Sequence, residues 1–517
     1  MADFSGLFRS TEEQATPIQA NVKGLIPQWL NGDFVRLGPG KFDLSKTKVK
    51  HWFDGLAVVY KFEIVNGTVF FRKRFLNSDA YKKATEHGQS VYTEFGTKAL
   101  PEPGKNILAK FIESLKPELT DNSHVNLFKM EDSLFVASET HFLRRVNVGN
   151  LETLDKIDLL ESTGVHLSSS HFVTDRKGDS YTIGTSLPIG KYNVIKVPKC
   201  ETGKADHGQE AIKHISVIST MSPGWGENIC FYHSFGVSEN YIVLIETPFI
   251  YNMLKLLSVH VKRRCLRECL NWYPDRTNRF FVIHKESGNV LPVNFRSREP
   301  FFLLHHINCY EEDDQLVVDI IKHKEVEVLD NLYLDNLRKS EFDIKNPAVG
   351  CRFVLPLPQK NQSFPINTNL ITISKKATAI KEKDTIWLSP ELLSEPGYEL
   401  PAINRQYFGV KYRFYYSTGM FDPGQFRNSL VKVDTMTGCV DTWRESESTF
   451  PGEPQFVHSP NPAAEDDGIL LSCVTDLRAN MHDFLLILDA RTMTEIARAE
   501  VDCHVPNVIH GLFIPKI

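Results

Sequence analysis

Cysteine is sparse and unpatterned in this 517-residue chain. It has nine cysteines, an odd number, and of these Cys265 and Cys269 lie close together in a chain without a Cys-x-x-Cys motif. A disulfide-stapled secreted domain needs an even set of cysteines at regular spacings. The pattern therefore argues against a disulfide framework and suits a reducing compartment.

Long apolar runs and targeting signals are also missing. No stretch approaches the ~18 consecutive apolar residues of a membrane-spanning helix. The start, MADFSGLFRSTEEQ, has neither the apolar core of a signal peptide nor an Arg-rich, acid-poor transit pattern. No basic block marks a nucleic-acid surface, and the formal net charge is −5. We expect a cytoplasmic protein without a nucleic-acid partner, with a mitochondrial location left open.

Helical periodicity is rare, and what recurs is alternation of apolar and polar residues on both sides of a polar turn. Such units occupy residues 60–75, 142–159, 280–295, 429–443 and 484–501. The first has Asn66-Gly67 at its turn, a pair typical of tight β-hairpins. No Pro/Ser-rich linker divides the chain. The sequence therefore predicts an all-β fold in one domain, 1–517.

Repeated hairpins over this length favour a β-propeller over a single sandwich, because each blade of a propeller is an antiparallel sheet. The innermost strand of each blade lines a central axis. A four-stranded blade with long loops takes roughly 40–70 residues, which gives about seven blades.

Two adjacent histidines end a buried strand in FFLLHHINCYEE (301–312). Neighbours in a strand point to opposite faces, so one of His305 and His306 should face inward. His171, His233 and His510 stand in similar apolar settings. The separations from His171 to His233 and from His233 to His305 are each about the length of one blade. Four imidazoles from four blades can therefore meet on the axis. Imidazole suits iron, copper, nickel and zinc, and four neutral ligands leave a divalent ion its full charge.

Three glutamates interrupt apolar or turn-rich stretches where a free carboxylate is costly: Glu139, Glu399 and Glu453. Metal-bound imidazoles usually donate their second N–H to a carboxylate or carbonyl. The glutamates fit that role, although from context alone ordinary positions at strand ends are the favoured explanation.

Nine ordered motifs resemble the carotenoid cleavage oxygenases, in the animal branch that includes the retinoid isomerohydrolase of the eye. They are GLIPQWLNGDFVRLGPGKF (24–42), HWFDGLA (51–57), TEFGTKALPEP (93–103), TDNSHVN (120–126), YHSFG (232–236), FFLLHHINCYEE, ELPAIN (399–404), AEDDGILLS (464–472) and IHGLFIP (509–515). The likeness covers nearly the whole chain.

The resemblance implies a seven-bladed β-propeller with a helical and loop cap over the tunnel and active site. It implies one non-haem Fe(II) per chain held by His171, His233, His305 and His510, with Glu139, Glu399 and Glu453 behind them. His306 is then the outward partner of His305.

The resemblance also implies the chemistry, in which O₂ is a co-substrate and a polyene double bond becomes two carbonyl groups. A carotenoid offers almost no hydrogen-bonding groups, so tunnel shape and aromatic walls must select it. Candidate wall residues are Phe53, Phe95 and Ser138. We expect central 15,15′ cleavage of β-carotene to retinal. Eccentric 9′,10′ cleavage to apo-10′-carotenals and ionones, cleavage coupled to isomerisation, retinyl-ester isomerohydrolysis and mere carotenoid binding are the alternatives.

Two amphipathic segments predict docking to a membrane, where the carotenoid is dissolved. Residues 105–116 place Ile107, Leu108, Phe111, Ile112 and Leu115 on one helical face. Residues 251–267 join an apolar stretch to Lys262, Arg263, Arg264 and Arg267. Both patterns are typical of interfacial helices, and of helices that cap a propeller. No obligate protein partner is implied.

Three positions depart from the pattern of relatives. Gly104 replaces a cysteine, which excludes lipid anchoring there, and Ser138 stands where threonine is common. His323 stands where the isomerohydrolase has a pocket tryptophan, which argues against ester isomerisation.

Overall fold

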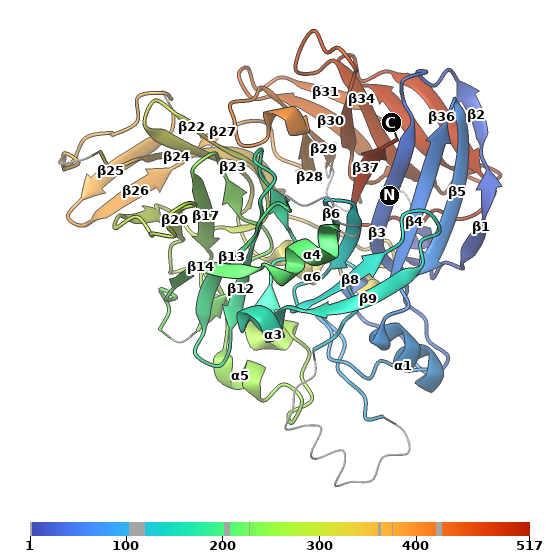
Figure 1. Cartoon of the computed structure of the whole chain (residues 1–517), viewed down its shortest axis with the longest axis horizontal. Coiled ribbons are helices and arrows are strands. Elements are labelled where there is room, and N and C mark those ends of the chain that lie inside the picture. The colour runs from blue at the N-terminus through green and yellow to red at the C-terminus, as the bar shows by residue number, and fades with distance from the viewer. Residues whose placement is uncertain are drawn as a thin grey trace.

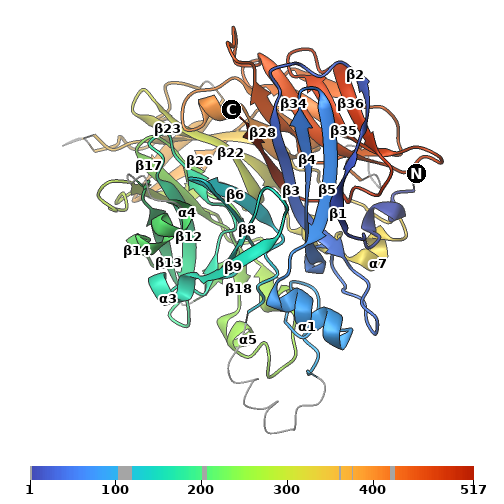
Figure 2. The same cartoon turned by 45° about the vertical axis from the view of Figure 1, so that its right-hand side comes forward.

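The computed structural model describes residues 3–102, 119–200, 207–226, 228–359, 363–374, 376–419 and 426–516. Almost all of its regular structure is antiparallel β-sheet. Figures 1 and 2 show the sheets arranged around a common centre, the arrangement of an all-β propeller. The predicted segment 105–116 and Gly104 lie outside the described residues, so the first amphipathic helix stays a prediction.

Both ends of the chain contribute to two neighbouring sheets. One sheet has the order β1 (Gln14–Gln19), β5 (Thr68–Phe75), β4 (Leu56–Val65), β3 (Gly32–Lys41) and β37 (His510–Pro515). The other has the order β2 (Asn21–Gly24), β36 (Glu495–Val501), β35 (Asp483–Asp489), β34 (Gly468–Asp476) and β32 (Thr449–Pro451), with β33 (Gln455–His458) also on β34. The C-terminal strand is thus an inner strand next to an N-terminal one.

The middle of the chain supplies the remaining sheets. Their strands are β6 (Asn126–Met130), β7 (Ser133–Ala137), β8 (Phe142–Val146) and β9 (Thr153–Asp158); β10 (Leu167–Ser168), β11 (Val173–Thr174), β12 (Ser180–Ser186), β13 (Lys191–Val197) and β14 (Ser216–Met221); β16 (Gly236–Val237), β17 (Tyr241–Glu246), β20 (Arg279–His284), β21 (Asn294–Ser297), β26 (Thr385–Ser389) and β25 (Thr378–Glu382); β22 (Phe302–Glu312), β23 (Gln315–His323), β24 (Val349–Pro356) and β27 (Glu391–Leu392); β28 (Tyr398–Ile403), β29 (Phe414–Gly419), β30 (Ser429–Asp434) and β31 (Val440–Trp443). A small sheet joins β15 (Ile229–Cys230), β18 (Phe249–Tyr251) and β19 (Leu270–Trp272).

The five predicted hairpins are confirmed: β4–β5, β8–β9, β20–β21, β30–β31 and β35–β36 all pair antiparallel. In the first, Asn66 and Gly67 both have positive φ, 49° and 77°. Two successive left-handed residues match the twist of the flanking strands, which is why this pair forms the tight turn.

The hydrophobic core is a closed circle of clusters between successive sheets. These clusters join the sheets of β3, β6, β12, β17, β22, β29 and β34 in that order, and one more joins the sheet of β34 back to that of β3. Strands such as β4, β12 and β35 are buried along nearly every residue, so both faces of their sheets are covered and each sheet packs on both of its neighbours.

Short helices and loops cover one end of the circle. The α-helices are α1 (Asp79–His87), α3 (Leu159–Thr163), α4 (His207–Lys213), α5 (Met253–Leu257), α6 (Glu327–Asp330) and α7 (Leu334–Leu337). The 3₁₀ turns are η1 (Ser5–Phe8), η2 (Trp52–Asp54), η3 (Arg267–Cys269) and η4 (Arg405–Tyr407). Buried residues of η1, η2, α5, α6 and α7 share one cluster with the sheet of β12, so they form a packed cap. Within the described ranges, no helix has both the length and the apolar character needed to cross a bilayer.

Candidate metal centre and cavity

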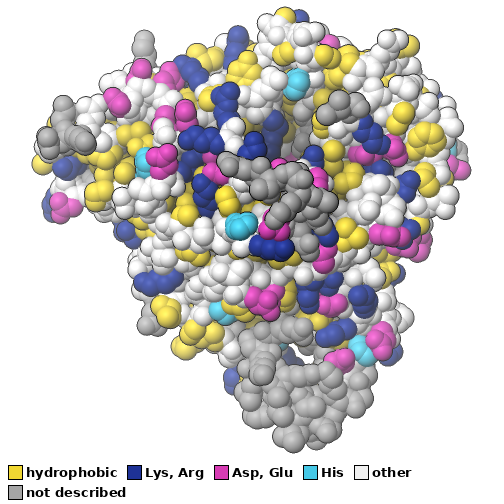
Figure 3. All heavy atoms as spheres, viewed as in Figure 1, with side chains coloured by type: hydrophobic (Ala, Val, Ile, Leu, Met, Phe, Trp, Pro, Cys, Tyr) yellow, Lys and Arg dark blue, Asp and Glu magenta, His cyan; other side chains and the backbone are white. Residues whose placement is uncertain are grey.

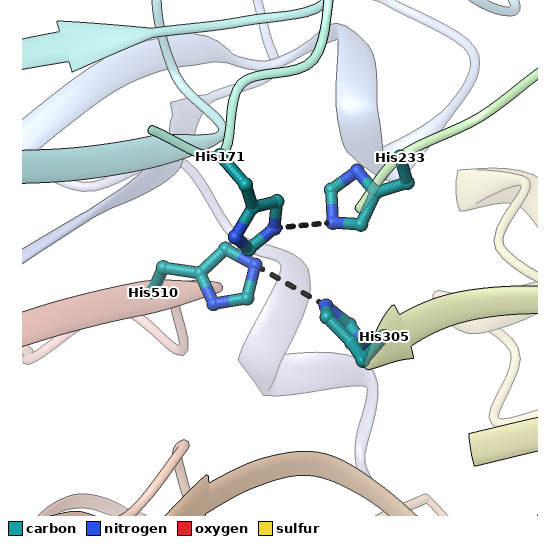
Figure 4. Close-up of side chains that lie close together, drawn as sticks. All are labelled: His171, His233, His305 and His510. Carbon is teal, nitrogen blue, oxygen red and sulfur yellow. Dashed lines mark hydrogen bonds between the residues drawn. The ribbon is translucent and has the colours of Figure 1, made fainter. Parts of the chain in front are cut away.

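The four histidines singled out from the sequence lie together at the centre of the circle (Figure 4). One ring nitrogen from each falls within 4.8 Å of the others. Nε2 of His171 is 2.9 Å from Nε2 of His233, and Nε2 of His305 is 3.4 Å from Nε2 of His510. Four imidazoles thus point their Nε2 atoms at one small volume.

Two of these histidines are not on regular strands. His305 is on β22 and His510 begins β37, but His171 lies in the break between β10 and β11, and His233 in the break between β15 and β16. Hydroxyl groups stabilise the breaks: Ser169 donates to the carbonyl of His233, and Ser170 Oγ donates to Glu139 at 3.0 Å. All four side chains therefore face the axis, as expected. Only His305 and His510 lie on strands, because the backbone leaves the β-ladder at His171 and His233.

Bulges aim the groups on the other side of the centre. The pairing of β22 with β23 shifts register on both sides of His306. The pairing of β28 with β29 shifts between Glu399 and Ala402, where Leu400 adopts a left-handed φ of 56°. A bulge re-aims side chains near a functional site, and here it turns Glu399 toward His305.

Each predicted glutamate meets a different imidazole. Nδ1 of His233 is 2.7 Å from Glu139, Nδ1 of His305 is 2.7 Å from Glu399, and Nδ1 of His510 is 2.8 Å from Glu453. When a carboxylate accepts the Nδ1 proton, Nε2 is left with a free lone pair. All three contacts therefore set the tautomer that a metal requires.

The fourth imidazole has an amide instead. Nδ2 of Asn126 lies 3.2 Å from Nδ1 of His171. The same Nδ2 group donates to the carbonyl of Ser170 at 3.3 Å, and the amide oxygen of Asn126 accepts from the backbone N–H of Leu127 at 2.9 Å, so the amino group faces the ring. His171 therefore lacks the carboxylate acceptor that the other three imidazoles have. The sequence analysis did not identify Asn126, although it belongs to the motif TDNSHVN.

Burial controls the charges at this centre. It lowers the pKa of His171 and of His510 well below the ordinary value, and the neighbouring imidazoles lower both further, so these rings are neutral ligands. Burial alone would raise the pKa of Glu399, but the hydrogen bonds from His305 and His323 hold that pKa well below its usual value. Burial would likewise raise the pKa of Glu139, which His233 keeps below normal.

Glu453 differs because burial raises its pKa despite a nearby cation. Nη1 of Arg36 lies 3.1 Å from Glu453, and the amide of Gly511 donates to the same carboxylate at 3.0 Å. Arg36 is fully buried. This arginine, which the sequence analysis missed, satisfies the carboxylate that orients His510.

His323 contacts the centre through Glu399. Its Nε2 is 2.6 Å from Oε1 of Glu399, whose Oε2 contacts His305. His323 is not among the described residues that line the adjoining cavity. His323 is therefore not a wall residue of this cavity. Its side chain contacts Glu399, the carboxylate that orients His305. His306 points away from the four imidazoles, and its Nδ1 is 2.8 Å from the hydroxyl of Ser234.

A largely apolar cavity of about 130 Å³ opens onto this centre. His233, His305, Glu139 and Glu399 form part of its wall. Its lining also includes all three wall residues proposed from the sequence, Phe53, Phe95 and Ser138. A second cavity, of about 650 Å³ and more polar, reaches His171, His305 and His510. The centre therefore lies between an apolar and a polar cavity.

Comparison with known proteins agrees with this geometry. The family model described as retinal pigment epithelial membrane protein matches residues 7–515. Gallus gallus beta,beta-carotene 15,15'-dioxygenase is 37% identical over 98% of this chain and 97% of its own. Mustela putorius furo mitochondrial carotenoid-cleaving dioxygenase is 36% identical over 98% of this chain and 96% of its own. The solved structure of cobalt-substituted Synechocystis apocarotenoid oxygenase shares the fold, with a TM-score of 0.78 at 21% identity over 99% of this chain and 98% of its own. The chain therefore belongs to the family of the retinal pigment epithelial membrane protein, the carotenoid oxygenase family that its motifs resemble.

Proposed function

We propose that this protein is a dioxygenase that cleaves a carotenoid, with one Fe(II) bound by His171, His233, His305 and His510. The observation that carries this proposal is the convergence of four imidazole Nε2 atoms beside an apolar cavity, whose wall includes His233 and His305. The donor set fits the ion, because four neutral nitrogens suit divalent iron and contacts to glutamate fix the tautomers of three of them. Four ligands leave two positions of an octahedral ion open.

Bound iron supplies the activation of O₂ beside a polyene double bond, and both oxygen atoms enter the two carbonyl products. The chain's own residues position the polyene and exclude water. Phe53 and Phe95, whose ring centroids are 6.0 Å apart, form part of an aromatic wall. Such a wall has shape but few hydrogen-bonding groups, so it selects by fit, as a hydrocarbon substrate requires.

The bond we assign is the central 15,15′ bond of β-carotene, which gives two molecules of retinal. Support comes from the identity of 37% to a relative named for this reaction, over nearly the full length of both chains. Eccentric 9′,10′ cleavage is the second candidate, because the carotenoid-cleaving relatives are almost equally similar.

Product identification separates these candidates. The purified Fe(II)-loaded protein is incubated with β-carotene in air, and the products are identified by mass. We expect retinal alone, and apo-10′-carotenals with ionones would overturn the assignment. A shift to 13-cis or 11-cis products would reveal coupled isomerisation. Retinol formed from retinyl ester under strict anoxia would reveal an isomerohydrolase. His510→Ala is the matched control, since it removes one ligand and leaves the cavity.

We also infer that the chain is a single seven-bladed propeller. The circle of apolar clusters joins seven sheets of four or more strands, and the pairing of β37 with β3 closes it. Limited proteolysis tests this inference. We expect no stable subdomain, and a fragment that keeps its fold after separation would contradict it.

We propose further that the cap docks on a membrane surface. Leu254, Leu257 and Val261 are 82%, 48% and 51% exposed on and just after α5. Figures 1 and 2 both show α5 at the lower end of the molecule, near α1. Tyr251 and Leu266, which flank this segment, line the apolar cavity. An exposed apolar patch beside the mouth of an apolar tunnel gives a lipid-soluble substrate a direct route.

The segment 251–267 is less helical than its pattern predicts. Only Met253–Leu257 forms α5, and Arg263 has a left-handed φ of 47°. Arg267 pairs with Asp330 at 2.7 Å, so it is not free for lipid headgroups. Figure 3 shows basic and acidic side chains both occurring over one face of the molecule. The docking therefore rests on the apolar side chains, with Lys262 and Arg263 as the exposed cations beside them.

Vesicle flotation tests the docking. The double substitution Leu254→Asp with Leu257→Asp should weaken binding to phosphatidylcholine vesicles at least 10-fold, because burying each leucine is worth about 1.5–3 kcal/mol. Leu25→Asp is the matched control, since Leu25 is also 82% exposed but lies next to β2. Because one relative is named as mitochondrial, vesicles with cardiolipin are included. Equal binding of all variants would contradict the docking.

A further inference from the structure

An arginine lies on the wall of the apolar cavity without an ion pair to any residue that the structure describes. Arg427 is one of the lining residues and is only 4% exposed. Its guanidinium lies over two aromatic rings, 5.3 Å from the centroid of Trp52 and 4.8 Å from that of Phe426. Within the part of the chain that the structure describes, its Nη2 is buried without a hydrogen-bond partner, and no ion pair of Arg427 is found.

Such a group is costly where it stands. A buried charge is normally paired, and a buried donor without an acceptor loses the hydrogen bonds that water gave it. Burial lowers the pKa of Arg427 to about 10, so the side chain still carries its charge at neutral pH. The other buried arginine near the centre, Arg36, has its carboxylate partner in Glu453. Among the described residues, Nη2 of Arg427 has no acceptor, whereas the Nη1 and Nη2 groups of Arg36 both have one.

The surroundings indicate which acceptor fits Nη2 of Arg427. Aromatic rings cover the guanidinium, so a ligand must approach its edge, where the N–H groups point. The carboxylates of Glu399 and Glu453 attract the charge, whereas burial and Arg36 oppose it. The cavity is otherwise largely apolar and the proposed substrate is a neutral polyene, so the acceptor that fits is a neutral oxygen on that polyene.

We propose that Arg427 is a specificity-determining residue of the cavity, which selects polyenes that carry a neutral oxygen function, a hydroxyl or a carbonyl, over hydrocarbon polyenes. This proposal rests on the proposed function, because it concerns the same cavity. It deepens that function by ranking its substrates: β-carotene binds by fit alone, and polyenes with an oxygen function bind more tightly through one added hydrogen bond.

The test measures binding apart from cleavage. The Fe(II)-loaded protein is titrated under nitrogen with zeaxanthin, which has two hydroxyl groups, and with β-carotene, which has none, and tryptophan fluorescence reports binding. A hydrogen bond to a charged group is worth roughly 10- to 100-fold in affinity. We expect Arg427→Met to reduce the affinity ratio of zeaxanthin over β-carotene at least 10-fold. Arg427→Lys keeps a charged donor and should keep most of the ratio.

Arg276→Met is the matched control. Arg276 also lies over two rings, at 5.1 Å from Trp225 and 4.5 Å from Tyr273, but it does not line the cavity. Its substitution should leave the ratio within about 2-fold, as expected of a surface change. In air, the loss in Arg427→Met should lie mainly in KM for zeaxanthin, because the interaction is made before and during the reaction alike.

Three results would overturn the proposal: an unchanged ratio in a folded, iron-loaded Arg427→Met, an equal change in Arg276→Met, or a wild-type protein that binds β-carotene as tightly as zeaxanthin. The last needs no variant and so applies even where Arg427→Met does not fold. A wild-type protein that prefers zeaxanthin but cleaves neither polyene would defeat the proposed function and still support the role of Arg427.

Discussion

The contact between His323 and Glu399 gives the sharpest test of how the protein orients a metal ligand. His323→Phe keeps an aromatic ring of similar size beside Phe302 but removes the donor that lies 2.6 Å from Oε1 of Glu399. The carboxylate then keeps His305 and loses its second partner. A hydrogen bond to an ionised carboxylate is worth about 1.5–3 kcal/mol.

Only part of this energy contributes to the binding of iron. Groups bonded directly to a ligand change metal affinity 10- to 100-fold, and His323 is one bond further away. We therefore expect His323→Phe to weaken Fe(II) binding roughly 10-fold. Competition with a coloured chelator measures this affinity directly. His323→Gln retains a donor and should bind iron within about 3-fold of the wild type.

The same substitution should change the pH at which iron is lost. In the folded protein the pKa of Glu399 is held below its ordinary 4.5 by His305 and His323. A depressed carboxylate pKa contributes stability above the unfolded value, and that contribution is lost as pH falls through the folded value. Without His323 the folded pKa rises, so the variant should release iron at a higher pH than the wild type.

His141→Phe is the control for removing a buried histidine, because His141 bonds the carbonyl of His166 and not a glutamate of the centre. It should leave iron affinity unchanged. An affinity within 2-fold of the wild type in His323→Phe, with the same pH of release, would refute this reasoning.

Three further predictions concern other parts of the molecule. His510→Ala should reduce iron from one per chain to near zero by elemental analysis while circular dichroism is unchanged, and retained iron would contradict the ligand set. Leu486→Ala should lower the free energy of unfolding by about 2–5 kcal/mol in urea, because Leu486 is fully buried between the sheets of β29 and β34; exposed Met436→Ala should change it by less than about 0.5 kcal/mol. Burial raises the pKa of Glu246 from 4.5 to about 7, so its contribution to stability is present below pH 4.5 and lost as pH rises through 7. Glu246→Gln should remove a difference of about 3 kcal/mol between pH 4 and pH 8, and an unchanged pH profile would contradict the assignment.

The parts of the fold that the sequence predicts are those with local signals. The β4–β5 hairpin follows from alternation on both sides of Asn66-Gly67, since the turn and its two strands lie within residues 56–75. The strand breaks at His171 and His233 have no such signal. Both depend on side-chain contacts between distant segments, such as Ser169 with His233.

The residues of the candidate site also divide into those with a local sequence signal and those without one. The histidines and glutamates stand out because a polar group among apolar residues needs a partner. Their partners do not stand out: Arg36 and Glu453 are 417 residues apart, and His323 and Glu399 are 76 apart. Arg427 follows a segment with no repeat pattern, and only the packing of Trp52 and Phe426 shows that its charge is buried.

X-ray absorption at the iron edge of the purified protein tests the central claim most directly. We predict one iron per chain with four imidazole nitrogens and no sulfur or glutamate oxygen in direct contact. A spectrum with three or fewer imidazoles, or with a carboxylate bound to the metal, would contradict it.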